Sequence, residues 1–162
     1  MSKIIYGLET VKPNGSLLNK LDAYQLRQLR KIIGWTPTYI DRTKTNESAI
    51  NEINRIIKSQ NNDTENLFMK LSDKLQLKQN KLFGHILRSN NDDPIRQITF
   101  LPDTATPNIP NKKRVGKPRQ NWIISTAKYV YENVLFKNQG RIYQNTQDIN
   151  DQILQAAKDR IF

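Results

Sequence analysis

The sequence predicts a mostly α-helical protein, made of a small helical bundle, an extended basic arm rich in proline, and a C-terminal helical pair. Apolar residues recur at helical spacing in several segments, and capping or turn residues bound each segment. Between residues 101 and 120 this spacing stops, and the segment contains four prolines and five basic residues, which favours an extended backbone. We therefore expect a helical domain over 1–100, an arm over 101–120, and C-terminal helices over 121–162.

The first helix is predicted over residues 17–33, after the turn formed by Pro13, Asn14 and Gly15. Ser16 is the expected N-cap, and Gly34 is the expected residue just past the C-terminus. Its apolar residues share one broad face and should be core: Leu17, Leu18, Leu21, Tyr24, Leu29 and Ile32. Its basic residues fall together on the opposite face: Lys20, Arg27, Arg30 and Lys31.

Three further helices are expected before the arm. Thr45 or Asn46 can cap a helix whose narrow apolar stripe runs from Ala49 to Ile57. Regularly spaced leucines predict a long helix over 67–86 that Ser72 can restart, and Gly84 within it costs about 1 kcal/mol relative to alanine, which close packing would offset. Asp93 and Pro94 form a cap and first turn for a short helix that reaches about residue 100.

The C-terminal helical pair is predicted over 121–137 and about 148–160, with Gly140 between the two helices.

The charge of the chain points to a polyanionic partner. Its 26 basic and 15 acidic residues give a formal net charge of +11, which favours nucleic acid over an anionic membrane surface. Cysteine is absent and His85 is the single histidine, so disulfides and zinc knuckles are excluded and no metal or other cofactor is expected. No apolar run approaches the roughly 20 residues that span a bilayer, so we expect no membrane partner, while the compartment stays open.

The arm is the first candidate nucleic-acid contact. Its basic side chains have no acidic neighbour and can follow a phosphate backbone: Lys112, Lys113, Arg114, Lys117 and Arg119. Gly116 permits a close backbone approach, and Pro118 stiffens the strip. The alternative is a linker that serves solubility or nuclear import.

The basic face of the first helix is a second candidate, with Arg27, Arg30 and Lys31 assisting the arm; the alternative is an ordinary solvated face. Tyr24 and Trp35 can stack on bases or pack in the interior. His85 has no orienting partner nearby in the sequence, and Asp92 and Asp93 suit turn and capping chemistry. We expect no catalytic residue and no small-molecule substrate.

Six short motifs occur in order along about 5–132 of the chain: Tyr6-Gly7-Leu8-Glu9-Thr10, Leu21-Asp22-Ala23-Tyr24, Leu29-Arg30-Lys31-Ile32-Ile33-Gly34, Thr45-Asn46-Glu47, Leu82-Phe83-Gly84-His85-Ile86-Leu87-Arg88, and Arg114-Val115-Gly116-Lys117-Pro118-Arg119-Gln120-Asn121-Trp122. This order resembles the thumb and post-thumb region of LINE-type non-LTR retrotransposon reverse transcriptases. The resemblance implies helices that grip template RNA or an RNA–DNA hybrid, and it adds Arg88 to the candidate contacts.

The chain departs from that family at several points. Val11, Gln28 and Lys117 stand where the family usually has tryptophan, cysteine and arginine. Neither the aromatic-x-Asp-Asp palm motif nor an endonuclease region is found, so we expect no enzyme activity from these residues. The alternatives are a subunit recruited into a large ribonucleoprotein, such as a divergent ribosome, and a scaffold that binds protein through helices such as the one at 46–58.

Overall fold

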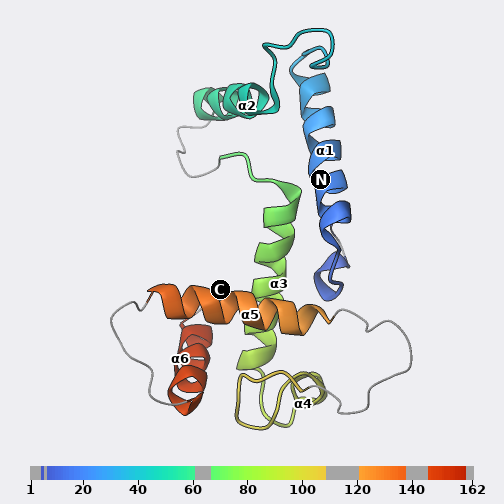
Figure 1. Cartoon of the computed structure of the whole chain (residues 1–162). Coiled ribbons are helices and arrows are strands. Elements are labelled where there is room, and N and C mark those ends of the chain that lie inside the picture. Colours follow the sequence, from blue (N-terminus) through green and yellow to red (C-terminus); the bar gives the residue numbers. More distant parts are fainter. Residues whose placement is uncertain (1–4, 6, 61–66, 109–120, 138–145, 160–162) are drawn as a thin grey trace, which may run out of the picture. The chain divides into compact units, whose positions relative to one another are not determined.

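The computed structural model describes residues 5, 7–60, 67–108, 121–137 and 146–159. Within these residues the chain is mostly helical, as the sequence predicted, and an isolated antiparallel bridge joins Phe100 to Pro107 (Figure 1). The elements are a short 3-10 helix, η1 (Leu8–Thr10), and the helices α1 (Gly15–Ile32), α2 (Asn46–Gln60), α3 (Leu71–Arg88), α4 (Pro94–Thr99), α5 (Trp122–Lys137) and α6 (Thr146–Lys158).

The chain forms two compact units. One contains Pro13–Lys74, and the other contains Met1–Lys12 with Leu75–Phe162. Helices on both sides of the arm thus belong to one unit, whereas the sequence placed 1–100 and 121–162 in separate domains. The reason is that α5 and α6 bury their apolar side chains in the same core as the second half of α3.

Helix α1 begins earlier than predicted. Asn14 is its N-cap, with an extended backbone and a side-chain Oδ1 that accepts from the Leu17 N–H at 2.8 Å, so the expected cap Ser16 lies inside the helix. At the other end, Gly34 has the positive φ of 69° that a residue just past a helix C-terminus adopts, as expected. Helix α1 packs against α2.

Polar side chains of α1 hold the start of α3. Gln25 is only 3% exposed; its Nε2 donates to the Met69 carbonyl at 3.1 Å, and its Oε1 accepts from the Leu71 N–H at 2.8 Å. The Asp22 carboxylate accepts from the N–H and the hydroxyl of Ser72 at 2.9 and 2.7 Å. These bonds satisfy N–H groups that a helix start leaves unpaired. They fix the start of α3 at Leu71, four residues later than the leucine spacing predicted.

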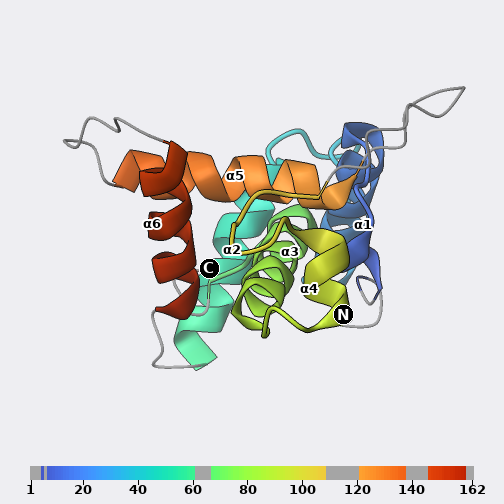
Figure 2. The same cartoon turned by 90° about the horizontal axis from the view of Figure 1, so that it is seen from below.

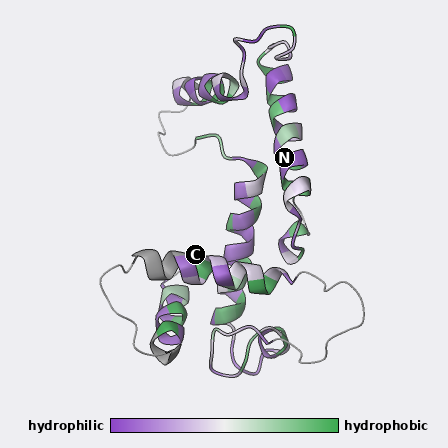
Figure 3. Ribbon diagram, viewed as in Figure 1, coloured by the Kyte–Doolittle hydropathy of each residue, from purple (hydrophilic) through white to green (hydrophobic). Residues whose placement is uncertain are grey.

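The predicted apolar face of α1 is only partly buried. Ile32 is 74% exposed, and Leu17 and Tyr24 are exposed as well, so their assignment to the core was wrong. Hydrophilic and hydrophobic residues alternate along α1 in Figure 3. Within the Pro13–Lys74 unit, the buried apolar side chains come instead from α2, at Ala49 and Ile53, and from Leu71.

The other unit has a larger core. Phe83 of α3 is fully buried, and its ring meets that of Phe100 edge-on with centroids 5.2 Å apart and planes at 84°. Helices α5 and α6 run in clearly different directions in Figures 1 and 2, and both contribute side chains to the core around these two rings. Gly84, next to Phe83, is buried. The other buried members are Ile86, Leu87, Ala105, Ala127, Val130, Ile153, Ala156 and Ala157.

Predicted caps of the later helices agree with the structure in part. The Asp93 side chain accepts from the Ile95 N–H at 2.8 Å, and Pro94 opens α4, as expected. Asn121 accepts from the Ile123 N–H at 3.0 Å and starts α5 at the predicted place. Helix α6 starts at Thr146, two residues before the predicted start.

Tyr131 gives a stability prediction for alkaline pH. Its hydroxyl donates to the Ala105 carbonyl at 2.6 Å, and burial raises its pKa to about 12 from the ordinary value of 10.0. Between these values the unfolded chain loses the proton while the folded chain keeps it, so the free energy of unfolding falls as pH rises from about 10 to 12. Urea unfolding at pH 8 and pH 11 should show this decline, and Tyr131→Phe should remove it.

At pH 8 the same Tyr131→Phe substitution should cost about 1 kcal/mol, because it leaves the buried Ala105 carbonyl without its donor. The control is Tyr39→Phe, at a ring that is 84% exposed, which should change the free energy of unfolding by less than about 0.5 kcal/mol. An equal effect of both substitutions would contradict the prediction.

Candidate nucleic-acid interface

All predicted contacts in the arm lie outside the described residues, in the segment 109–120: Lys112, Lys113, Arg114, Gly116, Lys117, Pro118 and Arg119. The remaining predicted contacts can be located. They are Arg27, Arg30 and Lys31 on α1, and Arg88 at the end of α3.

Helix α1 carries an exposed basic surface, which consists of Lys20, Arg27 and Lys31. Arg27 and Lys31 are four residues apart, so they project from neighbouring positions of the same helix face. No described residue pairs with any of these three cations through a hydrogen bond or a salt bridge. Their charges are therefore not balanced by any residue that the structure describes.

Arg30 is not part of that surface. It is 9% exposed, and its guanidinium donates to the carbonyls of Thr36 at 3.2 Å and Lys44 at 2.7 Å and to Asn46 Oδ1 at 3.0 Å. The residue does lie on the side of α1 away from the buried Gln25, as the helical spacing requires. The segment 35–45 folds back over it, however, and turns a predicted phosphate contact into an anchor for that segment.

The segment between α1 and α2, residues 35–45, is a closed loop. The N–H groups of Ile40 and Asp41 donate to the Pro37 carbonyl at 3.0 and 3.2 Å and form a turn. Asp41 in turn accepts from the hydroxyl and the N–H of Thr43 at 2.6 and 3.0 Å, and these bonds lower the pKa of its carboxyl. Tyr39 lies within the turn and is 84% exposed.

A pocket of about 680 Å³ lies between α1 and this loop. Three cations line it, Arg27, Arg30 and Lys31, together with the aromatic residues Trp35 and Tyr39. The remaining lining residues are neutral: Ala23, Leu26, Pro37, Thr38 and Asn46. The described lining thus combines three positive charges and two aromatic rings, and no described carboxylate belongs to it.

The sequence had marked Trp35 and Tyr24 as candidates for base stacking. Trp35 lines the pocket, with the Lys44 ammonium 5.8 Å from its ring centroid, whereas Tyr24 is exposed elsewhere on α1 and does not line it. Tyr39 was missed. The signal that could have found it is an aromatic residue two positions after Pro37, because such a turn holds its central side chains out of the core.

Arg30 gives a prediction about the loop. Replacing it by methionine should cost about 2 kcal/mol of unfolding free energy, since three oxygens lose charged hydrogen bonds. Arg27→Met on the same helix is the matched control and should be nearly neutral, because Arg27 is exposed. Urea unfolding measures the cost, and hydrogen exchange should show faster opening at the Ile40 amide in the Arg30 variant alone.

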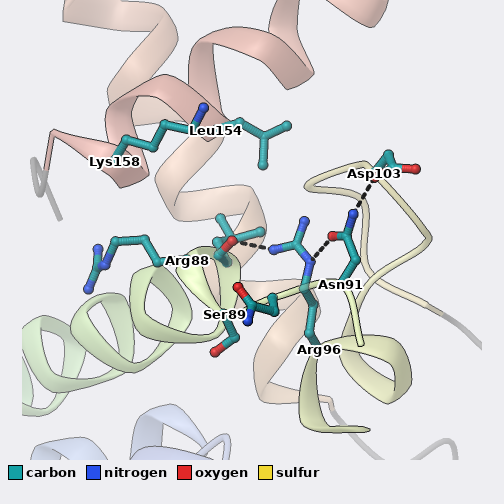
Figure 4. A pocket seen from close by; sticks show the side chains of 9 residues that line it. Arg88, Ser89, Asn91, Arg96, Asp103, Leu154 and Lys158 are labelled. Atoms are coloured by element: carbon teal, nitrogen blue, oxygen red, sulfur yellow. Dashed lines mark hydrogen bonds between the residues drawn. The ribbon is translucent and has the colours of Figure 1, made fainter. Parts of the chain in front are cut away.

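Arg88 borders a second pocket, of about 610 Å³, near the end of α6 (Figure 4). Arg96 also lines this pocket and is 6% exposed. Its Nε donates to Asn91 Oδ1 at 2.9 Å, and its Nη1 donates to the Leu87 carbonyl. Asn91 in turn donates to the Asp103 carboxylate. The basic groups of this pocket are thus balanced in part by a carboxylate, unlike those of the α1 pocket.

The Arg88 side chain extends away from Arg96 in Figure 4. Its Nη1 donates to the Ala157 carbonyl at 2.9 Å, in the last turn of α6, where carbonyls lack helical partners. Arg88 is nevertheless exposed, and one such bond leaves other guanidinium donors for a further partner. Its structure is therefore compatible with both a capping role and a contact outside the chain.

Among the described residues, no group of three or more histidine, cysteine, aspartate or glutamate side chains is arranged to hold a metal ion. The same part of the chain contains no helix with the length and apolar character that crossing a membrane requires. His85 is exposed on α3, and Asp93 serves as the cap of α4.

The chain matches no known family model, and no curated protein or solved structure is significantly similar to it.

Proposed function

We propose that this chain binds nucleic acid, with RNA or an RNA–DNA hybrid favoured over DNA, and has no catalytic activity of its own. The observation that carries the proposal is the exposed basic surface of α1, whose three cations have no partner among the described residues. Two of them, Arg27 and Lys31, border a pocket that no described acidic residue lines. A phosphate backbone supplies the anions that this arrangement lacks.

The formal net charge of +11 supports the same partner. Each phosphate that the protein neutralises releases condensed counterions. For each such contact, a tenfold rise in salt concentration therefore lowers the logarithm of the binding constant by about 0.7 to 0.9. Surface cations that already have acidic partners contribute less to such a field. The three cations of α1 should therefore contribute more to binding than paired cations elsewhere.

The origin we propose is the thumb and post-thumb region of a LINE-type reverse transcriptase. It is supported by the order of the six motifs, one of which contains Arg30 and Lys31 of α1 and another Arg88, whereas Lys20 and Arg27 lie outside them. In this proposal the arm and α1 both bind the same RNA or hybrid.

Binding is tested by fluorescence anisotropy with the full chain. The ligands are a labelled single-stranded RNA, the same sequence as DNA, and the corresponding RNA–DNA hybrid, titrated at several salt concentrations between 50 and 200 mM. We expect a linear fall of the logarithm of affinity with the logarithm of salt, and tighter binding of RNA or hybrid than of DNA. Absence of binding to all three at 50 mM salt would overturn the proposal.

A matched pair of variants locates the contact. Arg27→Gln should reduce the slope of the salt dependence by about 0.7 to 0.9, the value of one phosphate contact. Arg55→Gln removes the same charge from α2, where Arg55 already donates to both oxygens of the Glu52 carboxylate at 2.9 and 2.7 Å. It should leave the slope unchanged, and equal losses would mean that binding follows net charge rather than α1.

The scaffold alternative gave the helix at 46–58 as one example of a helix that could bind a partner. Ala49 and Ile53, the centre of the apolar stripe of α2, are buried inside the Pro13–Lys74 unit and so are not free to enter a partner's groove.

Recruitment into a ribonucleoprotein would use the same basic surface. Crosslinking the native protein and sequencing the bound RNA separates the two origins: one stable structural RNA indicates a recruited subunit, and element-derived RNA indicates a retrotransposon fragment.

A further inference from the structure

The pocket between α1 and the loop 35–45 has the size and lining of a nucleotide site. Its volume of about 680 Å³ falls within the range of about 300 to 1,000 Å³ that small-ligand pockets occupy. We propose that it holds one unpaired nucleotide of a single strand, with the base against Tyr39 and Trp35 and the phosphate at Arg27 and Lys31. This inference rests on the proposed nucleic-acid binding and specifies which part of the ligand is recognised.

The aromatic side of the pocket selects an unpaired base. Tyr39 is 84% exposed, yet its backbone is held in the turn that Ile40 and Asp41 close onto the Pro37 carbonyl. A ring held in water on a closed turn loses little freedom when a base stacks on it. In a duplex the faces of each base are covered by its neighbours, so this ring is accessible to a base only in an unstacked single strand.

The opposite wall supplies the charge for the phosphate. Arg27 and Lys31 are exposed and have no partner among the described residues. Among the described residues, the partners of Arg30 are neutral oxygens, which occupy three of the five N–H groups of its guanidinium. Three positive charges in one lining repel one another, and an entering phosphodiester relieves that repulsion.

Two neutral polar residues, Thr38 and Asn46, also line the pocket. Asn46 Oδ1 is occupied by Arg30, which orients the side-chain amide so that its N–H groups remain for a ligand, and the Thr38 hydroxyl also lines the pocket. Both can bond to a base edge or a ribose hydroxyl. A lone anion would use the cations alone and a lone apolar ligand would use the rings alone, whereas a nucleotide uses both.

The loop's structural role does not account for Tyr39. Arg30 and Asp41 close the loop through hydrogen bonds that do not involve the tyrosine ring. The apolar surface of its ring is therefore exposed to water and makes no stabilising contact with a described residue. Its exposed position allows the Tyr39 ring to stack on a base.

The experiment compares single-stranded RNA with duplex RNA of the same length, both carrying 2-aminopurine, whose fluorescence falls on stacking. The variants of the full chain are Tyr39→Ala, Tyr39→Phe, and the control Ile40→Ala, at a neighbouring residue that is 62% exposed and does not line the pocket. Loss of one stacking ring should weaken single-strand binding about 5- to 150-fold. Tyr39→Phe should retain affinity and quenching, and duplex binding should be the same for all variants.

The outcomes separate this inference from the proposed function. Single-strand binding that Tyr39→Ala weakens no more than Ile40→Ala overturns the nucleotide site but leaves nucleic-acid binding in place. An equal loss of duplex and single-strand affinity in Tyr39→Ala also overturns it, since it indicates a general effect on the fold. Failure of the unaltered chain to bind either ligand overturns both proposals.

Discussion

Replacing all five basic residues of the arm by alanine is expected to flatten the salt dependence of RNA binding: Lys112, Lys113, Arg114, Lys117 and Arg119. If each neutralises one phosphate of a single strand, the slope of log affinity against log salt should fall by about 3 to 4 units. Anisotropy titrations across the same salt series measure this slope directly. No other change proposed for this chain removes as many phosphate contacts.

The control for the arm variant carries the same loss of charge elsewhere. Five exposed cations outside both the arm and the α1 surface are replaced by alanine: Arg42, Lys58, Lys70, Lys74 and Lys81. This control should retain most of the slope. Equal flattening would mean that net charge alone governs binding, and an unchanged slope in the arm variant would favour the linker interpretation.

Salt dependence also distinguishes the arm from the pocket. Counterion release depends on phosphate contacts, whereas stacking on Tyr39 involves no net charge. Tyr39→Ala should therefore lower affinity by a similar factor at every salt concentration, while the arm variant should lose affinity mainly at low salt. A strand that contacts both should show both effects, and the two effects should add if the contacts are independent.

Local sequence signals predicted most helices well. Asp93 and Pro94 start α4, and Gly34 follows α1 with a positive φ, because each residue's own backbone and side-chain chemistry favours that position. The start of α1 was missed because Asn14 and Ser16 are both good caps. The extended backbone at Asn14 decides between them, and Gly15 tolerates the first helical position.

The site itself depends on contacts that sequence spacing does not contain. Arg30 occupies the basic side of α1, as periodicity requires, but its burial follows from the return of the loop 35–45, whose path is set by bonds to Thr36, Lys44 and Asn46. Gln25 is buried in place of an apolar residue because it satisfies the backbone at the start of α3. In both cases a tertiary hydrogen bond overrides the preference of the residue type.

Phe83→Ala should have the largest effect on stability. The side chain is fully buried, meets Phe100 at 5.2 Å, and contacts the core to which α5 and α6 contribute, so its loss leaves a cavity in the Leu75–Phe162 part of the chain. We expect a cost of about 3 to 5 kcal/mol, measured by urea unfolding. Leu77→Ala on the same helix, where Leu77 is 42% exposed, should cost less than about 1 kcal/mol.

The Phe83 variant also tests whether the pocket depends on that core. Every residue that lines the α1 pocket belongs to the Pro13–Lys74 unit, whose buried side chains are those of Ala49, Ile53 and Leu71 together with the bonded Gln25 and Arg30. Quenching of 2-aminopurine should therefore survive Phe83→Ala at temperatures below its lowered unfolding midpoint. Loss of quenching together with the core would show that the pocket forms only when both units are folded.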